Sequence, residues 1–389
     1  MTASLRRAAG SLLVVGLGGT ELTGLERAWL KLVRPAGIIL FKRNIVDARQ
    51  TRALLDEAAG LGAAHGLLCV DVEGGTVDRL RDALAAMPSA QAVTTASFRP
   101  TLSQSARKDG APGLKPKSGG AGLAQEHGEL IARAVKAFGF NTTLAPVLDL
   151  GLPESAEVLG TRTAAANAAG VVEYARAFLR GLAAQGVVGC GKHFPGLGGG
   201  ARDSHLETPA IRRSGREIWR DDVAPYRELR DELPMVMVNH AAYPETPGKG
   251  RPASVSAYWT STVLRKRVGY KGIAFSDDLE MGGILKFMPM EEAVVAAVRA
   301  GMDLMEICHS PELVLRAYEA LSAEGERSAA FRAMLFARAK RTERLRAKLF
   351  TDGFSPALTP KQFDALHQRI LRFGEKVASA QISAEVQTA

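Results

Sequence analysis

The chain has 389 residues, of which 46% are hydrophobic and 23% charged, with a formal net charge of +9. A disordered chain would be poorer in apolar residues, so this composition indicates a folded protein of up to two or three domains, or one large α/β barrel. No apolar run approaches the roughly 18–20 residues of a membrane-spanning helix, which excludes a transmembrane protein. The widely spaced Cys69, Cys190 and Cys308 form no C-x-x-C motif and fit a reducing compartment.

The positive charge does not by itself indicate a nucleic-acid-binding protein. The basic residues are spread along the chain, and aromatic residues make up only 6% of it. The densest basic cluster, Lys340 to Lys348, contains Glu343 and follows a helical pattern, so we interpret it as a solvated helix face.

Short apolar runs alternate with amphipathic stretches along the chain. The runs are Leu12–Leu17, Gly37–Phe41, Leu67–Val72, Thr143–Leu150, Val187–Phe194, Pro234–His240, Gly272–Asp278 and Met302–Cys308. They are apolar throughout, as in strands buried on both faces of a parallel sheet, and helical patterns such as Ala124–Phe138, Ala165–Ala184 and Met290–Ala300 lie between them. The pattern predicts an α/β fold, a (β/α)8 TIM-type barrel, with an open doubly wound sheet as the alternative.

The first run, Leu12–Leu17, follows Arg6 and Arg7 and weakly resembles a secretion signal, but we interpret it as the first strand. Residues 103–122 are rich in Gly, Ser, Lys and Pro and are predicted to form a flexible loop insertion. We therefore expect one barrel domain over residues 1–310 and a helical extension packed on it over residues 311–389.

Ionisable residues gather where several of the predicted strands end. The third strand runs into Asp71 and Glu73, the fifth into Lys192-His193, and the seventh into Asp277-Asp278. In a barrel these ends meet at one face, where active sites lie. The clustering therefore predicts a functional site there.

A glycine-rich loop follows Lys192 and His193 and leads to Asp203-Ser204-His205. A carboxylate two residues from an imidazole can orient it, and a histidine can exchange a proton near neutral pH. The simpler alternative is a surface turn with an exposed His205. At the seventh strand end, Asp277 and Asp278 point in different directions, and one of them can act as a nucleophile or a metal ligand.

The order of these motifs resembles one enzyme family. DxEGG, APVLDL, KHFPG, DSH and FSDDLxM, between about Leu12 and Cys308, are similar to the β-N-acetylglucosaminidases of glycoside hydrolase family 3 that have a lone barrel domain. The resemblance implies that Asp277 is the nucleophile and His205 the acid/base, supported by Asp203. It also implies that the N-acetylglucosamine unit is bound by Asp71, Arg79, Arg162, Lys192 and His193.

The chain departs from the family pattern at a few positions. Leu197 stands where the family usually has histidine, Val72 stands where it has glutamine, and the segment after Arg162 lacks the usual Phe-Gly pair. No proposed catalytic group is missing. The departures therefore bear on substrate preference more than on reaction class.

Other roles remain open for several of these residues. Arg79 and Arg162 can pair with surface carboxylates, and Asp278 or Glu73 can be catalytic in place of its neighbour. We expect Glu73 to hold the turn at Gly74-Gly75 and His240 to hydrogen-bond within its own loop. We expect His65 and His127 to be exposed.

The leading hypothesis is a retaining exo-β-N-acetylglucosaminidase that acts on cell-wall muropeptides in the cytoplasm. It would be a monomer with no cofactor, no metal, and no nucleic-acid or membrane partner. One alternative is a β-N-acetylglucosaminide phosphorylase with the same residues, which product analysis with and without phosphate would reveal. Others are a metal-dependent hydrolase using His193, His205, His240 and Asp277, and a non-catalytic sugar-binding barrel.

Overall fold

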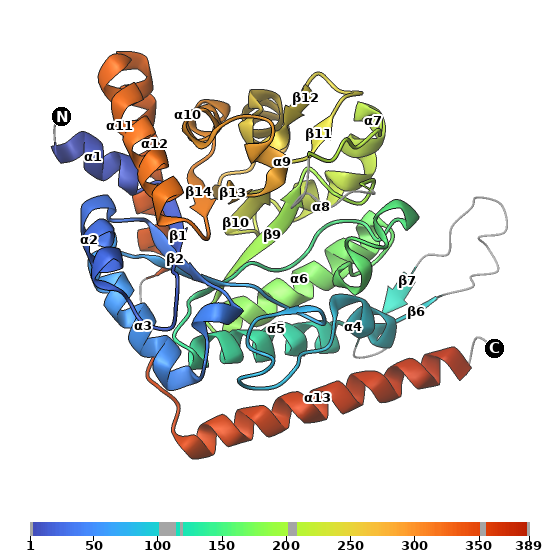
Figure 1. Ribbon diagram of the computed structural model, residues 1–389. Coiled ribbons are helices and arrows are strands. Elements are labelled where there is room, and N and C mark those ends of the chain that lie inside the picture. The colour runs from blue at the N-terminus through green and yellow to red at the C-terminus, as the bar shows by residue number, and fades with distance from the viewer. Residues whose placement is uncertain (1–2, 101–113, 117–119, 201–207, 351–354, 387–389) are drawn as a thin grey trace.

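The computed structural model describes residues 3–100, 114–116, 120–200, 208–350 and 355–386. Its centre is a closed barrel of eight parallel strands in the order β1-β2-β3-β8-β9-β10-β13-β14 (Figure 1). The strands are β1 (Leu13–Gly16), β2 (Gly37–Leu40), β3 (Leu67–Val70), β8 (Thr142–Thr143), β9 (Val188–Phe194), β10 (Met235–Val238), β13 (Ile273–Asp278) and β14 (Leu304–Ile307). Each lies within or overlaps one predicted run, so the predicted barrel is confirmed and the open-sheet alternative is wrong.

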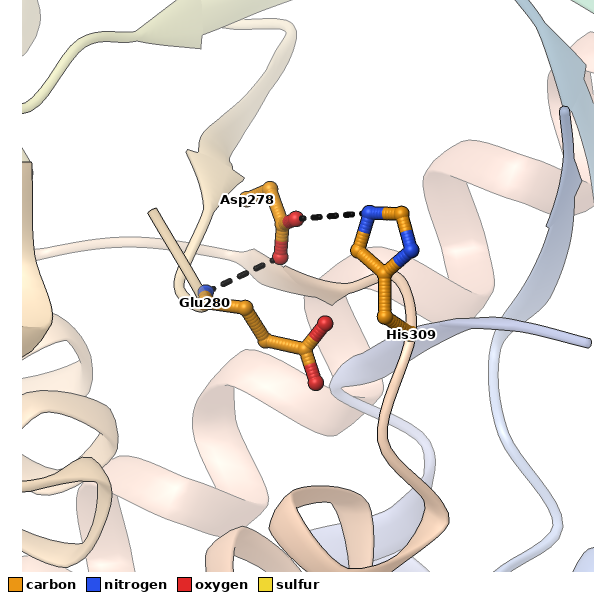
Figure 2. A group of neighbouring side chains, drawn as sticks. All are labelled: Asp278, Glu280 and His309. Atoms are coloured by element: carbon orange, nitrogen blue, oxygen red, sulfur yellow. Dashed lines mark hydrogen bonds and ion pairs between the residues drawn. The ribbon is translucent and has the colours of Figure 1, made fainter. Parts of the chain in front are cut away.

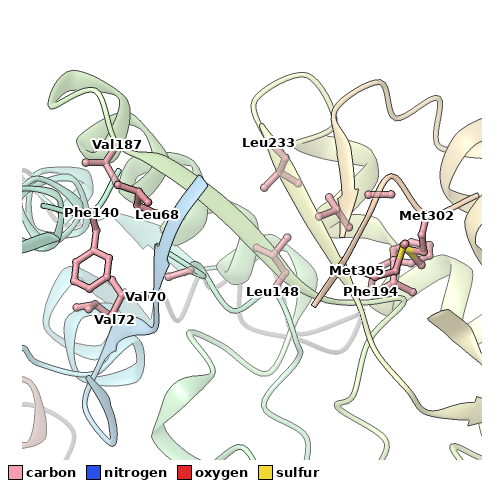
Figure 3. Close-up of a cluster of buried hydrophobic side chains, with 14 of the residues drawn as sticks. Leu68, Val70, Val72, Phe140, Leu148, Val187, Phe194, Leu233, Met302 and Met305 are labelled. Carbon is pink, nitrogen blue, oxygen red and sulfur yellow. The ribbon is translucent and has the colours of Figure 1, made fainter. Parts of the chain in front are cut away.

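Apolar side chains cover both faces of the barrel strands. On β14, Leu304 points into the barrel, whereas Met305 and Ile307 point out toward the helices. Figure 3 shows part of the outer layer, including Leu68 and Val70 of β3. Burial on both faces explains why the strands read as continuous apolar runs rather than as alternating ones.

Helices surround the barrel and connect its strands. They are α1 (Ala3–Gly10), α2 (Gly24–Val33), α3 (Ala48–Leu61), α4 (Ala90–Ser97), α5 (Gly120–Ala137), α6 (Ala168–Ala184), α7 (Gly215–Glu217), α8 (Ala224–Glu228), α9 (Gly282–Leu285), α10 (Met290–Ala300), α11 (Pro311–Arg327), α12 (Ala329–Leu349) and α13 (Pro360–Val386), with π-helices at Ile218–Asp222 and Tyr258–Arg267. Side chains cap the N-termini of several helices. Thr23 and Glu26 form a capping box on α2, and Asn167 caps α6.

Short segments complete the fold. They are the 3-10 helices Lys42–Asn44, Pro153–Ser155, Gly160–Arg162 and Ala253–Val255, and the antiparallel pairs β4 (Val72–Gly74) with β5 (Val77–Asp78), β6 (Phe98–Pro100) with β7 (Leu114–Pro116), and β11 (Ala242–Tyr243) with β12 (Lys249–Pro252). In the predicted insertion 103–122, residues 101–113 and 117–119 lie outside the described residues. In the part that is described, Leu114–Pro116 pairs with β6 and α5 begins at Gly120, and the flexible insertion as a whole stays a prediction.

Helix α12 closes the end of the barrel at which the strands begin. Its Leu345 and Leu349 pack against the interior cluster of the barrel. Arg346 is only 1% exposed and donates from Nη1 to the carbonyls of Ala36, Ala64 and His65. The basic cluster that we interpreted as a solvated face therefore lies partly against the barrel, because the unpaired carbonyls at the strand starts require donors.

A buried carboxylate fastens α12 to the same end. Asp303, just before β14, is fully buried and pairs with Arg265, Arg338 and Arg341. Arg338 and Arg341 lie on α12, and Arg265 lies in the π-helix Tyr258–Arg267. Three cations around one carboxylate thus join two helices to the start of β14.

Helix α13 runs along α4 and α5 on the outside of the molecule (Figure 1). Its Leu366, Ile370, Phe373 and Val377 are buried, at the spacing of one helical face. The helices expected after Pro311 are therefore present, whereas the division into 1–310 and 311–389 stays a prediction. None of the helices in the described part of the chain combines the length and apolar character of a membrane span.

His127 on α5 is buried, which corrects the expectation that it is exposed. Its exposed fraction is 0%, and its Nδ1 lies 3.0 Å from the hydroxyl of Tyr174. Its ring stacks on Phe373 of α13 with the centroids 5.8 Å apart. Burial lowers the pKa of His127 to about 3, so the folded protein keeps this ring neutral.

We predict that His127 makes the protein less stable in acid. From pH 7 to pH 5 the unfolded chain gains a proton on this ring that the folded chain does not bind, which removes about 2 kcal/mol of unfolding free energy. Urea unfolding at both pH values should show that His127→Phe loses this part of the acid dependence. His65→Gln, which removes an exposed histidine, is the control and should keep it. An unchanged acid dependence in His127→Phe would contradict the assignment.

Candidate functional site

A cavity of about 210 Å³ opens at the carboxyl ends of the barrel strands. It is lined by side chains that include Ile39, Phe41, Asp71, Glu73, Arg79, Arg162, Lys192, His193, Leu197, Met237, Asp277, Asp278, Glu306, Cys308 and His309. Every predicted site residue that the structure describes is among them. Asp203 and His205 lie outside the described residues. The structure therefore brings together Asp277 and the residues predicted to bind the substrate.

Two carboxylates and two cations form a network on one wall of the cavity, which we call the Glu73 ion network (Asp71, Glu73, Arg162 and Lys192). Nζ of Lys192 lies 2.7 Å from Oδ1 of Asp71 and 2.7 Å from Oε1 of Glu73. Arg162 binds Glu73 in a bidentate pair, with both N–H···O distances 2.8 Å. Glu73 thus bridges the two cations. We expected its carboxylate to hold the turn at Gly74-Gly75, and its bonds to Arg162 and Lys192 correct that expectation.

The network keeps Glu73 and Lys192 charged although both side chains are buried. Burial acts to raise the pKa of Glu73, but Arg162 and Lys192 outweigh it and hold that pKa well below its ordinary value. Burial acts to lower the pKa of Lys192, but Asp71 and Glu73 raise it above its ordinary value. Arg162 therefore pairs with a buried carboxylate at the cavity, not with a carboxylate on the outer surface.

His193 is held by a carboxylate that the sequence analysis did not single out. Its Nδ1 lies 2.6 Å from Oδ2 of the fully buried Asp149, whose Oδ1 accepts a hydrogen bond from the amide of Leu197 at 2.7 Å. A carboxylate at Nδ1 fixes the ring and leaves Nε2 for other partners. The signal for Asp149 was present, because it is a carboxylate near the end of the apolar APVLDL run, just as Asp277 lies near the end of its strand.

The adjacent carboxylates Asp277 and Asp278 have different surroundings. Burial acts to raise the pKa of Asp277, but His193, His240 and Lys192 outweigh it and lower that pKa, so Asp277 is ionised at neutral pH. Oδ1 of Asp278 accepts the backbone amides of Glu280 and Cys308, and burial raises the pKa of Asp278 to about 7. Oδ1 of Asp277 accepts one backbone amide, that of Asp278 at 3.0 Å, and Asp277 is thus the member of the pair whose pKa is lowered.

His240 is buried and hydrogen-bonded, as we expected. Nδ1 lies 2.7 Å from the hydroxyl of Ser254, and Nε2 lies 2.9 Å from the carbonyl oxygen of Asp278. Because a carbonyl only accepts, Nε2 carries the ring proton. Its two ring nitrogens are thus both engaged, so neither offers a free lone pair to a metal ion.

One group of side chains at the cavity has the residue types and spacing of a metal site: Asp278, Glu280 and His309 (Figure 2). Nε2 of His309 lies 3.8 Å from Oδ2 of Asp278, and its Nδ1 lies 2.9 Å from Nη1 of Arg43. Arginine can only donate, so Nδ1 accepts and the ring proton lies on Nε2, facing Asp278. That proton and the Arg43 charge oppose a cation at this point.

Three further cavity residues were missed by the sequence analysis. Phe41 and His309 stack with their centroids 5.3 Å apart, and the guanidinium of Arg79 lies 6.0 Å from the ring of Phe41. Glu306, in the middle of β14, is only 2% exposed. A carboxylate inside an otherwise apolar run was the available signal for Glu306, whereas nothing in the sequence marks Phe41 as part of a cavity.

Comparison with known proteins gives the family. Residues 5–341 match the glycosyl hydrolase family 3 N terminal domain. The chain belongs to glycosyl hydrolase family 3. It is therefore a glycoside hydrolase, as the resemblance implied.

Relatives and solved structures agree with this membership. The chain is 36% identical over 303 residues to a beta-hexosaminidase of Alkalilimnicola ehrlichii, which covers 78% of this chain and 82% of that protein. It is similar to NagZ from Neisseria gonorrhoeae in complex with N-trifluoroacetyl-D-glucosamine, with a TM-score of 0.71, 28% identity, and 95% and 98% of the two chains covered. It is also similar to a family 3 beta-N-acetylglucosaminidase from Paenibacillus sp., with a TM-score of 0.79, 28% identity, and 95% and 68% covered.

We predict that Glu73→Gln destabilises the folded protein. The change leaves Arg162 and Lys192 buried with less compensating charge, which costs about 3–5 kcal/mol of unfolding free energy. Glu57→Gln is the matched control, because Glu57 pairs with Arg27 at the surface and should show no measurable change. Urea unfolding measures both variants. Equal stabilities would show that the network is not a structural requirement.

Proposed function

We propose that this glycoside hydrolase is a retaining exo-β-N-acetylglucosaminidase that releases terminal β-linked N-acetylglucosamine. The observation that carries the proposal is Asp277, a half-buried, ionised carboxylate in a cavity lined by hydrogen-bonding side chains. The beta-hexosaminidase name of the 36%-identical relative and the N-acetylglucosamine analogue bound by the similar NagZ structure support the sugar class.

In the proposed reaction Asp277 attacks the anomeric carbon. The bond from that carbon to the leaving oxygen breaks as the bond to the Asp277 carboxylate forms, and His205 gives its proton to the leaving oxygen. His205 then takes a proton from water, and the resulting hydroxide displaces Asp277 and releases the sugar with its original configuration. Asp203 orients His205. These two roles rest on the DSH motif.

The Glu73 ion network supplies contacts for the sugar in this proposal. Lys192 has three N–H donors, and within the described residues Asp71 and Glu73 engage two of them. The third donor suits a sugar hydroxyl, Asp71 suits one as an acceptor, and His193 offers Nε2. Arg79 and Arg162 complete the set, as charge-assisted donors at the cavity wall.

We also propose that the natural substrates are muropeptides in the cytoplasm. Phe41 and Arg79 line the cavity, and the guanidinium groups of Arg43 and Arg79 lie 4.8 Å and 6.0 Å from the centroid of the Phe41 ring. Two guanidinium groups there suit a leaving group that carries carboxylates, as muropeptides do. The three cysteines are buried and unpaired, which is compatible with a reducing compartment.

We predict that Asp277→Asn lowers the hydrolysis of an aryl β-N-acetylglucosaminide by at least ~10³-fold, because the amide is not a nucleophile. A fluorinated sugar that traps the glycosyl-enzyme should label Asp277 in the wild-type protein, as found by peptide mapping with fragmentation. Asp278→Asn is the control and should still be labelled at Asp277. Near-normal hydrolysis by Asp277→Asn, or a label on another residue, would contradict the mechanism.

We predict that His205→Ala loses activity in a way that depends on the leaving group. Loss of an acid/base residue lowers the rate by about 10²–10⁴-fold when the leaving group needs a proton. An aryl leaving group of low pKa needs little help, so glycosylation should be partly restored with it. Steady-state rates across a series of aryl substrates test this. A uniform loss across the series would contradict the acid role of His205.

A further inference from the structure

Glu306 is a buried carboxyl group that the proposed mechanism does not use. It lies on β14, where Leu304 and Cys308 on either side of it belong to the interior cluster and Met305 and Ile307 face outward. The alternation of a strand therefore points Glu306 into the barrel, and its side chain lines the cavity. Its backbone lies beside Asp278 on β13 and Val14 on β1.

Among the described residues, no cation forms an ion pair with the carboxyl group of Glu306. Within the described chain, its Oε1 is buried and has no hydrogen-bond partner. The cation that faces it is Lys192, whose contacts are with Asp71 and Glu73. A buried polar atom without a partner destabilises a fold, so its place on the wall of a ligand cavity calls for a functional explanation.

The surroundings of Glu306 favour the undissociated acid. Burial raises its pKa well above the ordinary value, and the nearby carboxyl groups of Asp278, Asp71 and Asp277 raise it further, against the opposing effect of Lys192. The other titratable groups near it on the barrel interior are the thiols of Cys69, Cys190 and Cys308. A neutral carboxyl can donate one hydrogen bond, which an ionised carboxylate such as that of Asp277 cannot do.

We propose that Glu306 contacts the bound sugar, donating a hydrogen bond from its carboxyl group to a sugar oxygen and thereby positioning the ring against Asp277. The proposal rests on the glycosidase function above, because it places a sugar in the cavity. As the pH rises and Glu306 ionises, the donor is lost and a negative charge develops beside Asp277. This contribution to substrate binding is therefore present at lower pH and lost toward alkaline pH.

The experiment compares the wild-type protein with Glu306→Gln, Glu306→Leu and Met305→Leu. Glutamine keeps a neutral donor that cannot ionise, leucine removes the donor, and Met305→Leu is a volume-conserving control on the outward face of the same strand. The measurements are kcat and KM for an aryl β-N-acetylglucosaminide from acid to alkaline pH, and the Kd of N-acetylglucosamine by calorimetry.

We expect Glu306→Leu to raise KM and Kd by about tenfold near neutral pH, the effect of one lost hydrogen bond, with Met305→Leu unchanged. Glu306→Gln should stay within about threefold of the wild-type KM and lose part of the decline on the alkaline side of the pH profile. Wild-type KM, Kd and alkaline decline in Glu306→Leu would overturn the proposal.

Failure of the glycosidase function would be visible separately. A wild-type protein that binds N-acetylglucosamine without turnover would overturn that function, and the Kd of Glu306→Leu would still test the contact. A wild-type protein that neither binds N-acetylglucosamine nor hydrolyses the glycoside would overturn both proposals.

Discussion

The Glu73 ion network is the constraint on which the rest of the site depends. Its four members come from three separate stretches: Asp71 and Glu73 follow β3, Arg162 ends a short 3-10 helix, and Lys192 lies within β9. Glu73 and Lys192 are buried and Asp71 and Arg162 are half-buried, so removal of one member leaves a charge of the opposite sign with less compensation. The wall of the cavity is therefore fixed before any ligand arrives. The donors and acceptors left over then face a ligand in a set geometry.

Four neighbouring carboxyl groups have different protonation behaviour because of what surrounds each of them. Glu73 lies between two cations and stays ionised, and Asp277 is kept ionised by His193, His240 and Lys192. Asp278 accepts two backbone amides yet has a pKa of about 7, and Glu306 has carboxylates as neighbours, which favours its neutral form. One small volume thus holds both an ionised candidate nucleophile and a neutral hydrogen-bond donor, because the surroundings move the pKa values of neighbouring carboxyl groups apart.

The barrel and most of the cavity were predictable from the sequence, because a strand buried on both faces leaves a continuous apolar run and a polar group at its end stands out. Asp71, Lys192, His193 and Asp277 were found in this way. Glu306 and His127 were not, for a physical reason: their environment comes from elements distant in sequence. His127 is buried by α13, more than two hundred residues further along the chain, and the role of Glu306 depends on neighbouring strands.

The arginines around Asp303 bear on how the barrel is completed. Arg338 and Arg341 reach back from α12 to the start of β14, and Leu345 and Leu349 of the same helix cover the interior cluster. A chain that stopped at residue 310 would contain all eight strands and every residue proposed for the site, yet Asp303 would keep only Arg265 and the barrel interior would be open to water at the end opposite the cavity. The strand ends that line the cavity and the helix that covers the opposite end of the barrel thus come from different parts of the chain. Residues far in sequence from the proposed site are therefore needed to hold its strands in place.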